Sequence, residues 1–243
     1  MSENSLSSFS SHVDPATTPD NVIKALSIDN LIFGLDHGQL DILLIKHREG
    51  ISAGRWALPG GWIRYDENLR DAASRHLLEL TGVSDLYLEQ LKTFGRVDRF
   101  PNERVVTVSY YALVSAEDYD LAAGHNAADA CWFNVRALPE LIYDHAEIIQ
   151  YGIEQLQQNV RRRPIGFNLL PEKFTLLQLQ ELYESILGTK LDKPNFRRKI
   201  MKMGLLASCD EKQTGVAHRA AKLYRFDEQA YNTLMEKGFS FEI

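Results

Sequence analysis

The sequence predicts an α+β protein of two domains, a strand-rich N-terminal domain and a C-terminal winged helix-turn-helix. In the first domain, apolar strand-like runs alternate with helical periodicity up to residue 163. After residue 164 the order is helix, turn, basic helix, strand, loop and strand. Charge divides at the same place: residues 1–160 hold 12 Lys and Arg against 23 Asp and Glu, whereas residues 161–243 hold 15 against 10. This asymmetry is expected where only the C-terminal domain meets a polyanion.

Composition places the chain among ordinary globular proteins, because 44% of its 243 residues are hydrophobic and 25% are charged. No apolar run approaches the roughly eighteen residues that span a membrane, so we expect no membrane partner. Residues 1–21 are rich in Ser, Thr, Asn and Pro, which predicts a disordered tail without the features of a secretory signal. The two cysteines, Cys131 and Cys209, fit a reduced cytoplasmic protein without disulfides.

The N-terminal domain, residues 22–163, is expected to begin with a hairpin. Residues 22–35 and 40–46 have strand character and flank a turn signal at Asp36–Gly38. The Pro59–Gly61 run is expected to break the strand before it. Three further strands are expected over residues 86–94, 105–114 and 129–133. A stripe of apolar residues predicts a helix over residues 145–163, which Pro164 ends.

Between these strands lies a motif that resembles the Nudix box. The residues at the family's spacing are Gly61, Glu67, Arg75, Leu77, Glu79, Gly82 and Val83. Two positions that carry carboxylates in the family hold His76 and Leu80 instead. The resemblance implies a Nudix domain, an α/β/α sandwich with a mixed sheet, whose hydrolytic machinery has been dismantled.

Helical geometry explains what the two replacements remove. We expect a helix that opens at Asp66 or Asn68 and ends at Gly82, with positions 76, 79, 80 and 83 on one face. In a working Nudix enzyme this face carries three carboxylates that gather magnesium. A single carboxylate does not hold two hard cations, so we expect no metal, no cofactor and no catalytic residue. The surviving charges predict a structural salt-bridge cluster, with Arg75 paired to Glu79 and Glu67.

The C-terminal domain, residues 164–243, contains two predicted helices and a wing. After a linker over residues 165–171, Thr175 and Gln178 form a capping-box pattern for a helix that Gly188 ends. Asp192 can cap a second helix over residues 193–203, and Gly204 ends it. Short strands are expected over residues 205–209 and 223–226, around a polar loop. A small helical dimerisation domain with a basic face is the alternative.

The second helix is the predicted DNA-recognition helix. Arg198 and Lys202 lie one turn apart on its outer face and can reach guanine edges or phosphates, and Asn195 can read an adenine edge. Other basic residues are expected to hold phosphates. The full predicted DNA-binding set is Lys193, Asn195, Arg197, Arg198, Lys199 and Lys202 in the helix, with His218, Arg219 and Lys222 in the wing.

The whole chain is similar to the Nudix-related transcriptional regulators. The resemblance covers about residues 24–226 and rests on the altered box, LIYDH at 141–145, FNLLPEKFTLLQLQELYE at 167–184 and NFRRKI at 195–200. It includes bacterial repressors of NAD-synthesis genes and relatives in the Bacteroidetes that control pentose-use genes. It implies a homodimeric repressor whose Nudix domain binds a small-molecule effector and whose winged helices bind double-stranded operator DNA.

The effector is expected near the charged loop GRVDRFPNER at 95–104, because loops on a rigid scaffold select ligands. For ADP-ribose, Arg96 or Arg104 would clamp the diphosphate. For a pentose sugar such as arabinose, Asp98, Glu67 or Glu79 would accept hydroxyl hydrogen bonds and Trp56 or Trp62 would stack on the ring. The likeness of the C-terminal half to the Bacteroidetes regulators favours a sugar. The alternatives are a hydrolase of ADP-ribose or a related nucleoside diphosphate sugar, and a protein-interaction module.

Overall fold

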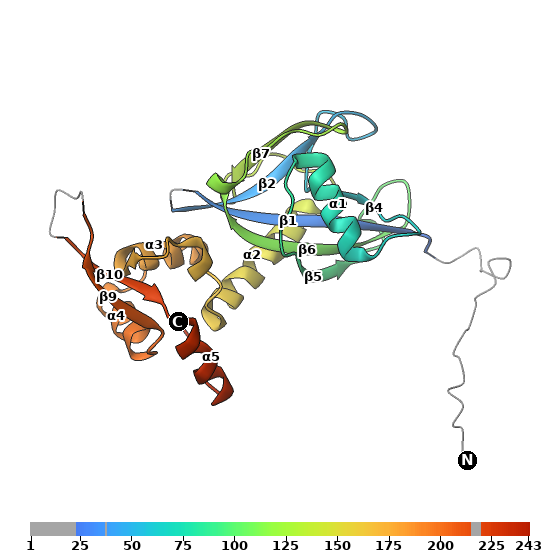
Figure 1. Ribbon diagram of the computed structural model, residues 1–243. Helices are drawn as coiled ribbons and strands as arrows, with labels where there is room; N and C mark the ends of the chain where they lie inside the picture. The colour runs from blue at the N-terminus through green and yellow to red at the C-terminus, as the bar shows by residue number, and fades with distance from the viewer. Residues whose placement is uncertain (1–22, 37, 215–219) are drawn as a thin grey trace, which may run out of the picture.

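The central strand of the N-terminal unit is buried on both of its faces. The computed structural model describes residues 23–36, 38–214 and 220–243. Along β1 (Ala25–Asp36), Ile28 and Ile32 point to one side and Leu31 and Phe33 to the other, all fully buried. A sheet that is apolar on both faces needs two covering layers. Helix α1 (Leu69–Thr81) covers one face and α2 (His145–Arg162) the other (Figure 1).

The sheet is mixed, as predicted. Its order is β3-β2-β1-β6-β5, with β4 added to β1 and β7 added to β2. β1 runs parallel to β6 and antiparallel to β2, and the remaining pairs are antiparallel. The other strands are β2 (Gln39–His47), β3 (Trp56–Ala57), β4 (Gly60–Trp62), β5 (Glu89–Phe94), β6 (Val105–Ser115) and β7 (Ala127–Asn134).

One strand of this unit was not predicted, and one predicted strand begins later than expected. Residues Gly60–Trp62 do not merely break a strand but form β4, which pairs with β1. Glycine permits this pairing, because a Cβ added at Gly60 would lie 2.1 Å from the carbonyl oxygen of Ile28. The strand predicted from residue 86 begins at Glu89, after the chain turns at Asp85 with φ of 60°. Asn68 takes the N-cap position of α1, and Gly82 ends it in the left-handed region with φ of 75°.

The C-terminal unit has the predicted helix-turn-helix and wing. Helix α3 (Leu176–Leu187) starts at the predicted capping box, where Thr175 and Gln178 exchange side-chain and backbone hydrogen bonds. Asp192 caps α4 (Lys193–Lys202) by accepting from Asn195 N. A small antiparallel sheet in the order β8-β10-β9 completes the unit, with β8 (Phe174–Thr175), β9 (Leu206–Lys212) and β10 (Lys222–Phe226).

One helix of this unit was not predicted. α5 (Glu228–Glu236) follows β10 directly, and Asp227 caps it by accepting from Ala230 N. The chain then turns back, so that Phe241 is buried and Ile243 N donates to the carbonyl of Arg161 at the end of α2.

A continuous apolar core joins the two units. It extends from the sheet through Leu156 and Val160 of α2 to Leu182 and Ile186 of α3. The predicted domain boundary at residues 163 and 164 lies directly after α2, so α2 belongs to the N-terminal unit and packs against the C-terminal one. The predicted tail over residues 1–21 lies outside the described residues.

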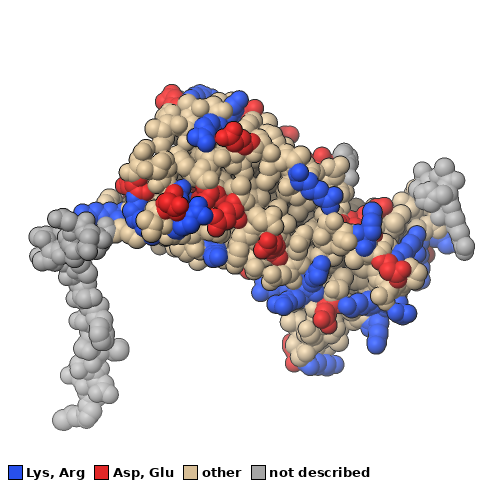
Figure 2. Space-filling model, turned by 180° about the vertical axis from the view of Figure 1, so that it is seen from behind, with Lys and Arg blue, Asp and Glu red and all other residues tan. Residues whose placement is uncertain are grey.

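Basic side chains gather on the C-terminal unit, where Figure 2 shows Lys and Arg in excess of Asp and Glu on the visible face. The N-terminal unit shows both signs interspersed. Of the helices that the structure describes, none is long and apolar enough to cross a membrane.

Candidate functional site

Arg75 holds the surviving carboxylates of the box in a salt-bridge cluster. Its Nε and Nη2 donate to the two carboxylate oxygens of Glu67 at 2.8 and 2.6 Å, and its Nη1 donates to Glu79 at 3.0 Å. The hydrogen bonds from Arg75 lower the pKa of Glu67 to about 2. Glu67 therefore stays charged and engaged at neutral pH, and the predicted pairing of Arg75 with Glu67 and Glu79 is confirmed.

The two replaced box positions are built into the fold. His76 Nε2 donates to the carbonyl of Trp62 at 2.8 Å, and burial lowers the pKa of its ring. Leu80 is 6% exposed and packs in an apolar cluster with Ile45 and Ile142. Within residues 23–36, 38–214 and 220–243, no group of three or more His, Cys, Asp or Glu side chains is placed to hold a metal ion.

Beside the box lies a pocket of about 250 Å³. It lies between the N-terminal end of α2, the strands β1 and β4, and the loop that follows β2. Its exposed surface is mostly apolar, with Asp29, Arg99 and His145 grouped at one end and further polar residues on β2 and the loop that follows it. The lining residues are Ser27, Asp29, His47, Glu49, Gly50, Ile51, Ser52, Leu58, Gly60, Gly61, Trp62, Arg99, Phe100, Val105, Ile142, Tyr143 and His145.

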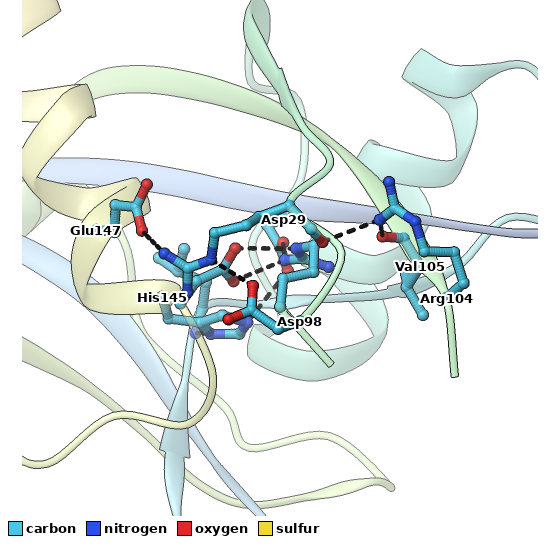
Figure 3. Close-up of polar contacts among 10 residues, drawn as sticks. Asp29, Asp98, Arg104, Val105, His145 and Glu147 are labelled. Atoms are coloured by element: carbon cyan, nitrogen blue, oxygen red, sulfur yellow. Dashed lines mark hydrogen bonds and ion pairs between the residues drawn. The ribbon is translucent and has the colours of Figure 1, made fainter. Parts of the chain in front are cut away.

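A buried ionic cluster forms the polar end of this pocket (Figure 3). Arg99 makes a two-pronged contact with Asp144, with both bonds at 2.9 Å, and also donates to Asp29 at 3.2 Å. All three side chains are at most 8% exposed. Two carboxylates thus share one guanidinium, which satisfies the charges that burial would otherwise leave unpaired.

His145, the first residue of α2, completes the cluster. Its Nδ1 accepts from Leu58 N at 2.9 Å, which places the ring proton on Nε2, 3.6 Å from Asp29. Burial lowers the pKa of His145, so the ring is neutral at neutral pH. The neutral ring ties the start of α2 to the strand region before the box.

Aromatic side chains form the wall of the pocket. Phe100 lies between Trp62 and Tyr143, with ring centroids 6.1 and 4.8 Å away. The hydroxyl of Tyr143 shares a hydrogen bond of 2.8 Å with Ser52. Rings that present faces and edges to one cavity can stack on a planar ligand group.

Apart from Trp62, the predicted effector residues do not line this pocket. Trp56 packs edge-on against Phe133 at 4.7 Å, and Glu67 and Glu79 belong to the Arg75 cluster. Among the loop residues, Arg96 pairs with Asp98 and with Glu147, and Arg104 donates to the carbonyls of Gly95 and Arg96 (Figure 3). Trp62, the other predicted stacking residue, does line the pocket.

Sequence reasoning missed the residues of the ionic cluster. Arg99 lies in the same loop as the predicted Arg96, but its side chain turns inward. Asp144 and His145 stand in the LIYDH motif, and Asp29 is a charge in the middle of a largely apolar strand. A charge inside a buried strand signals a partner elsewhere in the chain.

The predicted recognition helix presents most of its basic residues to solvent. Lys193, Asn195, Arg198, Lys199 and Lys202 are exposed, whereas Phe196 and Ile200 are buried against the unit. Arg197 is half-buried, and its Nε has no hydrogen-bond partner among the described residues. Arg198 donates to the Asn195 side chain at 2.6 Å, so these two residues act as a pair.

The predicted wing is described only in part. Lys222 opens β10 and is exposed, with its ammonium 5.9 Å from the centre of the Tyr224 ring. His218 and Arg219 lie outside the described residues.

Comparison with known proteins follows this division of the chain. Residues 25–152 match the model of the NUDIX domain, and residues 166–226 match that of the NrtR DNA-binding winged helix domain. The chain is 37% identical over 210 residues to the ADPR responsive transcriptional repressor NtrR of Acinetobacter baylyi, which covers 85% of this chain and 84% of the relative. The chain belongs to the NrtR family.

Two solved structures show the same architecture as this NrtR-family chain. Shewanella oneidensis NrtR, crystallised with a 27mer DNA, is 30% identical with a TM-score of 0.68, covering 89% of this chain and 97% of that one. The NUDIX domain of the same protein, crystallised with ADP ribose, is 32% identical with a TM-score of 0.53, covering 60% and 94%. The predicted resemblance to Nudix-related regulators and the predicted two-part fold are confirmed.

Proposed function

We propose that this NrtR-family protein is a DNA-binding transcriptional repressor whose Nudix domain binds ADP-ribose as an effector without hydrolysing it. One observation carries the proposal: an open aromatic pocket lies beside a box whose remaining carboxylates are occupied by Arg75. Such a site can bind a nucleotide, but it offers no set of carboxylates to gather magnesium.

ADP-ribose is proposed rather than the pentose that the C-terminal likeness favoured. The Acinetobacter relative is a repressor responsive to ADPR, and the Shewanella NUDIX domain was crystallised with ADP ribose. In this chain the wall of Trp62, Phe100 and Tyr143 can stack on an adenine. Asp29 at the polar end can accept from a ribose hydroxyl. The predicted Arg96 and Arg104 remain proposed partners of the diphosphate outside the pocket.

The winged helix domain is proposed to bind operator DNA through α4. Its outer face carries four exposed basic residues and Asn195, and basic side chains dominate the visible face of the unit (Figure 2). In a helix-turn-helix, the second helix lies in the major groove. We expect two copies of the chain to bind a two-fold symmetric operator, as helix-turn-helix dimers do.

Effector binding is tested by calorimetry on the full chain with ADP-ribose, arabinose and xylose. We expect heat with ADP-ribose and none with the sugars. Phe100→Ala should weaken binding about fivefold or more, because stacking of a base on an aromatic ring is worth about 1–3 kcal/mol. Tyr65→Ala is the matched control, since Tyr65 is fully exposed and outside the pocket. Binding of arabinose alone would replace ADP-ribose by a sugar in the proposal.

Hydrolysis and DNA binding are tested on the same preparation. ADP-ribose with Mg²⁺ should yield no AMP or ribose 5-phosphate. Release of both, abolished in Glu79→Gln, would instead establish the hydrolase alternative. Duplexes selected from a random library should bind with strong salt dependence, and ADP-ribose should change their affinity. DNA binding that is absent at low salt would overturn the repressor function.

A further inference from the structure

Two side chains of the Nudix domain cap the last turn of α3 in the winged helix domain. Gln157 Nε2, on α2, donates to the carbonyls of Ile186 and Leu187 at 3.3 Å each. Arg136 Nη2, in the segment between β7 and α2, donates to the carbonyl of Gly188 at 3.1 Å. The last carbonyls of a helix have no donor within it, and a cation is favourable there. Gly188 closes the helix through its own N–H, and the other domain supplies these additional donors to its last carbonyls.

Gly188 shows how closely the two domains meet at this point. Its φ is 69°, and an added Cβ would lie 3.2 Å from Arg136 Nη2 and 3.8 Å from Gln157 Nε2. Ser185, in the same turn, donates to the carbonyl of Gly38 in the β1–β2 hairpin. These contacts border a cleft of about 700 Å³ between the two domains.

The capped turn leads directly into the recognition helix. Glu184 accepts from Lys190 Nζ at 2.6 Å and from Leu191 N at 3.0 Å, so the turn is held against α3. Asp192 then caps α4. A movement of the last turn of α3 is therefore carried to α4 rather than absorbed in a loose connection.

The opposite end of α2 reaches the effector pocket. His145, in the first turn, lines the pocket, and Asp144 before it is held by Arg99. Gln157 lies twelve positions after His145, which corresponds to about 18 Å of helix. At Gly152 an added Cβ would lie 2.4 Å from Leu31, so α2 lies directly on the sheet. One continuous helix joins the pocket to the cap of α3.

We propose that Arg136 and Gln157 are positioning residues that couple the effector pocket to the recognition helix. The proposal rests on the proposed function, in which ADP-ribose changes the affinity for DNA. A ligand that engages the polar end of the pocket displaces the start of α2. The cap passes this displacement to α3, and the turn at residues 189–192 carries it to α4.

The test measures coupling in the full chain. For each variant, the dissociation constant of a duplex selected from a random library is measured with and without saturating ADP-ribose. The wild-type ratio should be about fivefold or more. In Arg136→Ala/Gln157→Ala it should fall to about twofold or less, while the affinities for ADP-ribose alone and for DNA alone change little. Arg136→Lys, which keeps a donor, should retain most of the coupling.

Gln150→Ala is the matched control, because Gln150 lies on α2 and its side chain donates to Glu154 of the same helix. A double variant that keeps the wild-type ratio, or a control that loses as much, would overturn the proposal.

Hydrogen exchange without ligand separates this proposal from the proposed function. Amides of residues 188–192 should exchange several times faster in the double variant than in wild type or Gln150→Ala. If ADP-ribose does not change the DNA affinity of wild type, but exchange is faster in the double variant, then the proposed effector is wrong and the capping of α3 by Arg136 and Gln157 is supported. Unchanged exchange would refute the cap itself.

Discussion

Replacement of Arg99 by Leu is the sharpest test of the ionic cluster. The change removes three hydrogen bonds and leaves Asp29 and Asp144 buried without their cation. Removing one partner of a buried ion pair destabilises a protein by about 3–5 kcal/mol. Since about 1 kcal/mol shifts Tm by about 2–4 °C at this size, we expect Tm to fall by about 6–20 °C.

Thermal and urea unfolding of wild type, Arg99→Leu, Arg96→Leu and Arg99→Leu/Asp144→Asn checks this reasoning. Arg96→Leu is the control, because Arg96 lies in the same loop and pairs with Asp98 and Glu147 while 58% exposed. An exposed pair contributes at most about 1 kcal/mol, so this control should stay near wild type. Adding Asp144→Asn to Arg99→Leu should recover part of the loss, since one unpaired charge is then removed. Equal losses in both single variants would refute the buried ionic role of Arg99.

Three further predictions concern pH, folding and DNA. Burial lowers the pKa of His47, His76 and His145, so the unfolded chain binds more protons than the folded one below about pH 6.5. The free energy of unfolding should have its maximum value above that pH. It should fall by up to about 1.4 kcal/mol per pH unit for each ring as the pH decreases. A urea midpoint that stays constant from pH 7.5 to 5.0 would contradict this. Thr175→Ala should destabilise the winged helix domain by about 0.5–2 kcal/mol through loss of the capping box, measured by urea unfolding, and a change below about 0.3 kcal/mol would deny the cap a role. Arg198→Ala should weaken binding to a selected duplex by about 1–3 kcal/mol in a mobility-shift assay, whereas an equal loss on random DNA would make Arg198 a phosphate contact.

Features with local causes were predictable from the sequence. The capping box at Thr175, the left-handed glycines at 82 and 188, and the apolar stripe of α2 depend on residues within one or two turns. Strand β4 escaped prediction because glycines carry no strand pattern, and its partner, Ile28, is far away in the chain. Helix α5 was missed although Asp227 stands at its N-cap position; it spans nine residues, and none of them is buried.

The pocket depended on pairings that spacing cannot reveal. Arg96, Arg99 and Arg104 occupy one loop and look equivalent in the sequence, yet only Arg99 turns inward. Its partners are 45 and 70 residues away, in α2's cap and in β1. The sequence therefore located the loop and the box, whereas the choice of arginine followed from packing of the sheet.

The burial of Leu80 limits which side chains position 80 can hold. A carboxylate restored at position 80 would enter a cluster of Ile45, Ala57, Ala127 and Ile142, and an unpaired charge in such surroundings is destabilising by several kcal/mol. The side chain at position 76 also takes part in packing, because the ring of His76 fills the space over Gly61. A carboxylate at either position would therefore disturb contacts that the fold uses. Core packing thus opposes the metal site that cleavage of a bound effector would need.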